Sequence, residues 1–146
     1  MDDDLLEAAR AIMRISLHAA DQIGGVSVVQ LRALTVLDRE PQVNLAQLAE
    51  GMGVTVSTTS RLVDRLVAAG MVDRRRAEHS RREIALTLTD VGLATLDRYD
   101  ELRLEGLNAV LDVLQEGERE QVIGAFGLFA AAANESTHLP ATAGQA

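Results

Sequence analysis

The chain has 146 residues, a formal net charge of −8 and no cysteine, so it fits one domain without a disulfide framework, a thiolate metal site or a cysteine redox sensor. Hydrophobic residues make up 47% of the chain but aromatic residues only 2%, which predicts a mainly α-helical fold with an aliphatic core. The start Met-Asp-Asp-Asp is not basic, and no apolar run approaches about 18 residues. We therefore expect a cytoplasmic protein without a membrane partner.

Two helices are predicted first. Apolar side chains at three- and four-residue steps predict a helix over about residues 3–23, and the glycine pair that begins at Gly24 ends it. The second helix starts near Ser27, where Gln30 completes the pattern of a capping box. It ends before Pro41, because proline cannot continue a helix and restricts the residue before it.

Two short helices and a hairpin are predicted next. Asn44 is expected to cap a third helix, and two glycines bracket the turn after it. A fourth helix over about residues 55–69 ends at Gly70. Two strands follow, one from Met71 through the next arginines and one over residues 83–88, where alternation places Ile84, Leu86 and Leu88 on one face.

The remaining chain is predicted to form two more helices. Thr89 is expected to cap a long helix over about residues 90–114. Gly117 is expected to break the helical segment before a last helix, which carries apolar residues between Val122 and Phe129. Residues 137–146, which are small and polar with one proline, are expected to be disordered.

The charges of the chain are unevenly distributed. All fourteen basic residues are arginines. Residues 54–89 hold seven arginines and four acidic residues, a local charge of +3, and the rest of the chain carries −11. Screening confines each interaction to about 8 Å at physiological salt, so this basic stretch can contact phosphates despite the acidic total.

The helix over residues 55–69 has the features of a DNA-recognition helix. With its apolar stripe against the body, the spacing of 100° per residue places Ser57, Arg61 and Asp64 on the opposite face. Hydroxyl groups bond phosphates or bases, and arginine suits guanine or phosphate. Val56 is placed to contact a thymine methyl group. The alternative interpretation is a Ser/Thr-rich helix start with a solvated arginine.

The hairpin is strongly basic. Arg81 and Arg82 near its tip are candidates for insertion into a narrow minor groove. Alternation along the first strand lets at most two of its three arginines share a surface. The alternative is a solvated charge run in which at least one arginine pairs with Asp64, Asp73 or Glu83, and Arg82 is a candidate for that structural role. The residues expected to contact DNA are Thr55, Val56, Ser57, Thr58, Ser60, Arg61, Arg65, Arg74, Arg75, Arg76, Arg81 and Arg82.

Taken together, these segments resemble the MarR family of bacterial winged helix-turn-helix regulators over nearly the whole chain. The resemblance rests on Leu48-Ala49, the segment 54–66, Gly70-Met71-Val72, Arg81-Arg82 and the segment 86–92. It implies six helices, a two- to three-stranded β wing and an intertwined homodimer. One domain would then span residues 1–136, with a DNA-binding lobe at about 27–92 and a dimerisation lobe at about 1–26 plus 93–136.

The resemblance also bears on the wing and on ligands. The wing of the family usually carries an acidic residue where this chain has Ser80, so Glu78 or Asp64 is expected to orient the tip arginines instead. Many relatives bind a small aromatic or phenolic effector between the lobes. Arg14, His18 and Asp38 are the candidate residues for such an effector. Neither a cofactor nor a metal is expected, because the three histidines are scattered along the chain.

The function that follows is sequence-specific DNA binding by a homodimeric transcriptional regulator. The family implies a ligand-responsive repressor that binds a near-palindromic site on double-stranded DNA. The alternative is a winged-helix protein-interaction module without operator specificity. An enzyme is disfavoured, because the sequence shows no nucleophile–base pair, glycine-rich phosphate loop or metal-ligand spacing.

Overall fold

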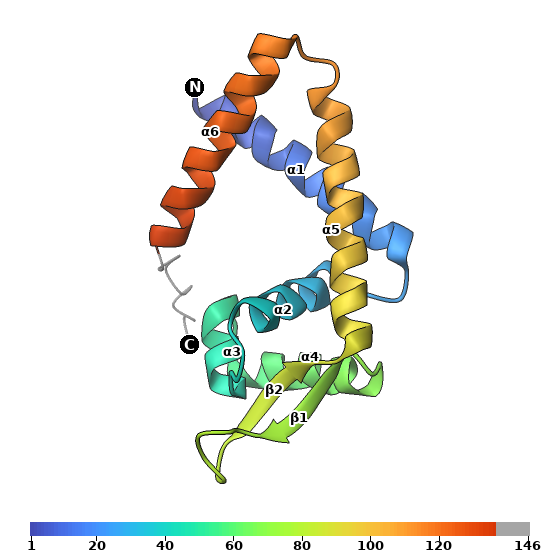
Figure 1. Ribbon diagram of the computed structural model, residues 1–146, viewed down its shortest axis with the longest axis vertical. Helices are drawn as coiled ribbons and strands as arrows, with labels where there is room; N and C mark the ends of the chain where they lie inside the picture. Colours follow the sequence, from blue (N-terminus) through green and yellow to red (C-terminus); the bar gives the residue numbers. More distant parts are fainter. Residues whose placement is uncertain (137–146) are drawn as a thin grey trace.

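The computed structural model describes residues 1–136, and the predicted tail 137–146 lies outside this range. Within it, six helices and one two-stranded antiparallel sheet confirm the predicted fold class (Figure 1). In chain order the elements are α1 (Asp2–Ile23), α2 (Val28–Arg39), α3 (Leu45–Met52), α4 (Val56–Ala68), β1 (Val72–Arg76), β2 (Ile84–Leu88), α5 (Asp90–Leu111) and α6 (Glu116–Glu135). An isolated bridge between Val43 and Leu86 adds a short third edge to the sheet.

Helix α5 connects two parts of the molecule (Figure 1). One end of α5 packs on α2 and β2, close to α3, α4 and the β1–β2 hairpin. Helix α1 crosses α5 further along, and α6 turns back from its far end. We keep the names that the resemblance implies: the part from α2 to β2 is called the DNA-binding lobe, and α1, α6 and the distal end of α5 are called the dimerisation lobe.

Side-chain caps start four of the helices as predicted. Ser27 and Asn44 accept hydrogen bonds from backbone N–H groups three residues ahead, at 3.1 Å and 2.8 Å, and both complete capping boxes. Thr55 caps α4 and Thr89 caps α5 in the same way. Because these caps satisfy N–H groups that a helix start leaves unpaired, the local sequence determines where each helix begins.

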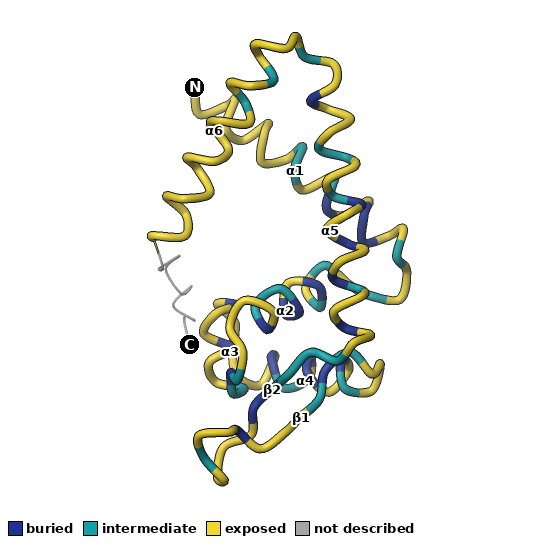
Figure 2. The backbone as a smooth tube through the Cα atoms, viewed as in Figure 1, coloured by how far each residue is buried: buried dark blue, intermediate teal, exposed yellow. Residues whose placement is uncertain are grey.

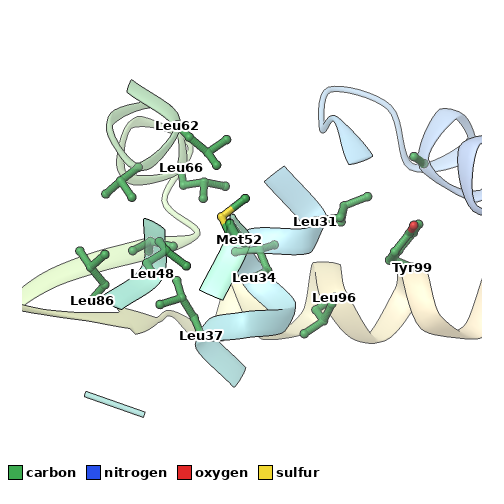
Figure 3. Packing of buried hydrophobic residues seen from close by; sticks show 14 of the residues in the cluster. Leu31, Leu34, Leu37, Leu48, Met52, Leu62, Leu66, Leu86, Leu96 and Tyr99 are labelled. Atoms are coloured by element: carbon green, nitrogen blue, oxygen red, sulfur yellow. The ribbon is translucent and has the colours of Figure 1, made fainter. Parts of the chain in front are cut away.

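The hydrophobic core lies mainly in the DNA-binding lobe and extends to α5 and the end of α1. Side chains from all three of its helices meet the inner face of the hairpin and the first half of α5 (Figure 3). The deeply buried members include Leu31, Leu34, Leu48, Val63, Leu66, Val72 and Leu96. Each buried aliphatic side chain contributes roughly 1.5–3 kcal/mol, so this cluster holds the helix pair and the wing in one unit.

A close approach fixes the wing to the start of α5. A Cβ atom at Gly92 would lie 2.1 Å from the backbone oxygen of Met71, a distance that no side chain tolerates. Thr89 also bonds this segment, because its hydroxyl donates to the Gly70 oxygen at 2.5 Å and its N–H to the Met71 oxygen at 3.1 Å. The base of the hairpin is therefore held against the helix that links the lobes.

The dimerisation lobe is poorly covered. None of the residues of α6 is buried, and large apolar side chains on α1 and the distal part of α5 are exposed as well (Figure 2). The exposed large side chains of these three segments are Leu5, Leu6, Met13, Leu17, Leu104, Val110, Ile123, Phe126, Leu128 and Phe129. Within residues 1–136, no helix has both the length and the apolar character needed to cross a membrane.

Three details differ from the sequence-based predictions. Ile84 is 48% exposed while Ala85 is 1% exposed, because Ile84 pairs with Arg76 at the end of the hairpin that projects beyond the helices. Helix α5 ends at Leu111, and residues 112–114 form a turn. Gly117 does not separate the last two helices but lies in the first turn of α6.

Candidate nucleic-acid interface

Helix α4 has one buried face and one exposed face. Thr59, Leu62, Val63 and Leu66 are buried against the core. The Thr59 hydroxyl donates to the Thr55 backbone oxygen at 2.8 Å, so this buried polar group is satisfied within the helix. The opposite face is open to solvent along the whole helix. Its exposed members are Val56, Ser57, Thr58, Arg61, Asp64 and Arg65, and Ser60 is partly exposed beside them.

The first turn of α4 presents hydroxyl groups in two roles. The Thr55 hydroxyl oxygen accepts the Thr58 backbone N–H at 3.2 Å, and the same hydroxyl donates to the Thr58 side-chain oxygen at 2.9 Å. Thr55 is therefore committed to capping, whereas Thr58 keeps its own hydroxyl proton for an external acceptor. Exposed Ser57 and Val56, the latter 50% exposed, complete a small polar and methyl surface that suits base edges and phosphates.

The wing arginines divide into paired and unpaired groups. Arg74 forms an ion pair with Asp64 of α4, and Arg75 pairs with Asp73 at 3.2 Å. Among the residues that the structure describes, Arg76, Arg81 and Arg82 form no ion pair. The prediction that at least one arginine pairs with an acidic residue is confirmed for two of them, but Arg82, the expected candidate, is not among them.

Two side-chain contacts order the tip of the wing: the Glu83 carboxylate lies 2.7 Å from the His79 Nε2 atom, and Ser80 stands at the usual acidic position. Its hydroxyl oxygen accepts the Arg82 N–H at 3.2 Å, a local bond that shapes the turn. Asp64, expected as an alternative partner for the tip arginines, pairs with Arg74 instead. Glu78 forms no ion pair within residues 1–136 either, so the expected replacement by these two acids is wrong. The reason is distance along the hairpin: Asp64 faces β1, not the tip.

The sequence analysis missed Gln42, which contacts the wing from the loop between α2 and α3. Its side-chain oxygen accepts the Glu78 N–H at 3.2 Å, across 36 residues of sequence. Gln42 also has a backbone φ of 65°, in the left-handed region. Neither the contact nor the conformation has a signal in the local pattern, because glutamine next to proline is ordinary in a polar loop.

The two basic and polar surfaces lie at one end of the molecule. Helix α4 packs against β1, and both lie at the end of the chain fold remote from α6 (Figure 1). The Asp64–Arg74 pair joins them directly. A helix face rich in hydroxyl groups thus lies beside a projecting hairpin with three unpaired arginines, which is the arrangement that reads a major groove and an adjacent minor groove.

The three effector candidates do not come together. Arg14 and His18 line one pocket of about 380 Å³ between α1 and α5, together with Ile15, Gln22, Leu102, Glu105 and Gly106. Within it, the His18 Nε2 atom lies 2.7 Å from the Gln22 side-chain nitrogen. Asp38 is exposed near the end of α2 and does not line this pocket. Across residues 1–136, no group of three or more acidic or histidine side chains is arranged to hold a metal ion.

Known proteins share this sequence pattern and this architecture. Residues 24–83 match the sequence profile described as the MarR family. The HTH-type transcriptional regulator BilQ of Clostridium symbiosum (strain WAL-14163) is 31% identical over 98 residues, which are 67% of this chain and 68% of BilQ. Another curated regulator matches over 41% of its own length.

Solved structures agree with the sequence match. The crystal structure of RV1404 from Mycobacterium tuberculosis has a TM-score of 0.80 and 34% identity, with 90% of each chain covered. The fold is also that of the transcriptional repressor CouR bound to a 23-mer DNA duplex, with a TM-score of 0.67, 24% identity and coverage of 89% of this chain and 92% of CouR. From its sequence and its fold, the chain belongs to the MarR family of winged-helix transcriptional regulators.

Proposed function

We propose that this chain is a homodimeric, sequence-specific DNA-binding regulator that represses transcription from a near-palindromic site. The observation that carries the proposal is the exposed hydroxyl face of α4 next to the three unpaired arginines of the wing. Arg61 and the hydroxyl groups are assigned to base edges, and Arg76, Arg81 and Arg82 to phosphates or the minor groove. The repressor CouR, which has the same fold, has been solved bound to a 23-mer DNA duplex, and this supports DNA as the ligand.

The proposed homodimer follows from the uncovered dimerisation lobe. Helix α6 has 20 residues and none of them is buried in its own chain. Isolated helices gain little stability in water, so a helix of this length needs a packing partner. In the proposed dimer, that packing partner is the exposed apolar surface of α1 and α5 of the second copy. Two-fold symmetry then presents two copies of α4 to successive major grooves, about 34 Å apart.

DNA binding is tested with fragments from the region upstream of the coding sequence. We expect a footprint with dyad symmetry and an affinity that falls steeply as salt increases, because several phosphates are contacted. Arg61→Ala is expected to change base preference, since this side chain lies on the exposed face of α4. Absence of any footprint at low salt, or binding to a protein partner that survives nuclease treatment, would instead favour a protein-interaction module.

The proposed assembly is tested by sedimentation equilibrium. A species of twice the chain mass at micromolar concentration is the expected result. The double variant Phe126→Ser/Phe129→Ser, which replaces two exposed apolar side chains of α6, is expected to sediment as a monomer. A wild-type protein that stays monomeric at high concentration contradicts the homodimer.

For the effector, we propose the pocket between α1 and α5 as the binding site. Arg14 offers a positive charge to a carboxylate or phenolate, His18 offers a ring nitrogen, and Ile15 and Leu102 offer apolar walls. Hydroxybenzoates are suitable probes, because they combine an anionic group with an aromatic ring. They are expected to release DNA from the wild type but not from an Arg14→Gln variant. Equal release from both proteins would remove Arg14 from the site.

A further inference from the structure

Within residues 1–136, one hydrogen bond joins the tip of the wing to a part of the protein outside the hairpin. We define the tip loop as residues 77–83, between β1 and β2. Its other hydrogen bonds are internal. Three involve backbone N–H groups: Ala77 N–H to the Glu83 oxygen at 2.9 Å, Ser80 N–H to the Ala77 oxygen at 3.3 Å, and Arg82 N–H to the Ser80 hydroxyl. The fourth joins two side chains, the His79 Nε2 atom and a Glu83 carboxylate oxygen, at 2.7 Å. In the described part of the chain, the Glu78 N–H bond to the Gln42 side chain is the hydrogen bond that leaves the loop.

Gln42 holds this bond from a strained backbone. Its φ of 65° makes it the non-glycine residue with positive φ among residues 1–136. That conformation costs free energy for a residue with a Cβ atom, and it persists only where surrounding contacts enforce it. The next residue is fixed in turn, because the Val43 oxygen accepts the Leu86 N–H at 2.8 Å. The loop between α2 and α3 therefore contacts the wing twice, through Val43 on β2 and through Gln42 at the tip.

From this geometry we infer that Gln42 is a positioning residue for DNA binding, which holds the tip loop in the orientation that presents Arg81 and Arg82. The inference rests on the proposed DNA-binding function. Ala77 is buried at the base of the tip loop, but the rest of the loop is exposed or partly exposed, so packing does little to hold its end. A bond to the body at Glu78 limits the swing of the tip, so the cost of ordering it on DNA is reduced before binding.

Three variants separate the hydrogen bond from the backbone strain. Gln42→Met keeps the side-chain length and the strained φ but removes the acceptor. Gln42→Gly removes the acceptor and relieves the strain, because glycine accepts positive φ without cost. Gln42→Glu keeps an acceptor at the same position. The glycine variant is therefore expected to unfold at a higher temperature than the methionine variant, although both lose the bond to Glu78.

The readouts are amide hydrogen exchange at Glu78 in the free protein, the melting temperature, and DNA affinity as a function of salt. We expect faster Glu78 exchange in the glycine and methionine variants, and protection retained in Gln42→Glu. Both variants without an acceptor are expected to bind DNA about three- to tenfold more weakly, with a salt slope reduced by about one, despite their different melting temperatures.

Other outcomes overturn the inference in distinct ways. Unchanged Glu78 exchange in all variants would show that the bond does not order the tip. Faster exchange with wild-type DNA affinity would show that tip order does not matter for binding, and affinities that follow the melting temperatures would show a merely structural role. A wild-type protein that binds no DNA would defeat the proposed function, while the Glu78 exchange would still decide whether Gln42 holds the tip.

Discussion

The DNA-binding lobe and α6 both carry large apolar side chains but differ in how far these are buried. In the lobe, leucines such as Leu34 and Leu48 are fully buried within one chain. In α6, Leu128 and Phe129 are 77% and 71% exposed. Both segments carry apolar residues at helical spacing, and both were predicted as helices. The difference shows that periodicity identifies a face to be covered but not which chain covers it.

The contrast also separates two kinds of stability. A core closed within one chain stabilises the fold at any protein concentration. A face covered by a second copy stabilises the protein only as far as the copies associate, so its contribution depends on concentration. Variants in the two regions are therefore expected to differ in the size of the stability loss and in how that loss depends on protein concentration.

The largest effect is expected from Leu48→Ala in α3. Leu48 has no exposed surface, so the change leaves a cavity under the helix pair and costs about 2–5 kcal/mol of unfolding free energy. Chemical denaturation followed by circular dichroism measures this loss. It is expected to be the same at low and high protein concentration, and a loss that grows on dilution would contradict a core closed within one chain.

The matched change in the other region is Leu128→Ala in α6. For a monomer, truncation of a side chain that is 77% exposed would be close to neutral. In a dimer it is expected to cost about 1–3 kcal/mol of association free energy, because the side chain is buried against the second copy. Sedimentation equilibrium gives the dissociation constant, and Leu93→Ala, in the half of α5 beside the wing, is the control. An unchanged dissociation constant would remove Leu128 from the interface.

A smaller effect, confined to DNA binding, is expected from Arg81→Ala. This arginine forms no ion pair within the described range, so its loss is expected to leave the melting temperature and dimer mass unchanged. DNA affinity is expected to fall by about 1–2 kcal/mol across sequences, with a salt slope lower by about one. Arg75→Ala, which removes an arginine already paired with Asp73, is the matched control and is expected to lose less. Equal losses would show that the ion pair does not withhold Arg75 from DNA.

Local rules predicted the elements that local contacts determine. Ser27, Asn44, Thr55 and Thr89 were identified as caps because each bonds a group three residues away. The split of α4 into a buried and an exposed face followed from helical geometry and the apolar stripe. Alternation gives the face that Ile84 shares with Leu86 and Leu88, but it does not give the point where the hairpin leaves the core, so the exposure of Ile84 was not foreseen.

The contacts that the sequence did not predict join residues far apart in the chain. The sequence offered Asp64, Asp73 and Glu83 as partners for the wing arginines but did not assign them, because the register of β1 on β2 and the position of α4 decide which charges meet. Gln42 was missed for the same reason, since its partner lies 36 residues away. The roles of Ser57, Arg61 and the tip arginines on DNA stay predictions until they are measured.

A small loss of stability is expected from Asp64→Asn, which breaks the ion pair between α4 and β1. Both side chains are well exposed, at 63% for Asp64 and 41% for Arg74, so the unfolding free energy is expected to fall by at most about 1 kcal/mol. DNA binding is expected to move the other way. The change removes a negative charge from the DNA-facing surface and releases Arg74, so binding to a random duplex should tighten and its salt slope should rise by about one. Weaker random binding would mean that Arg74 acts by aligning the wing with α4, and the pair would then be structural rather than inhibitory.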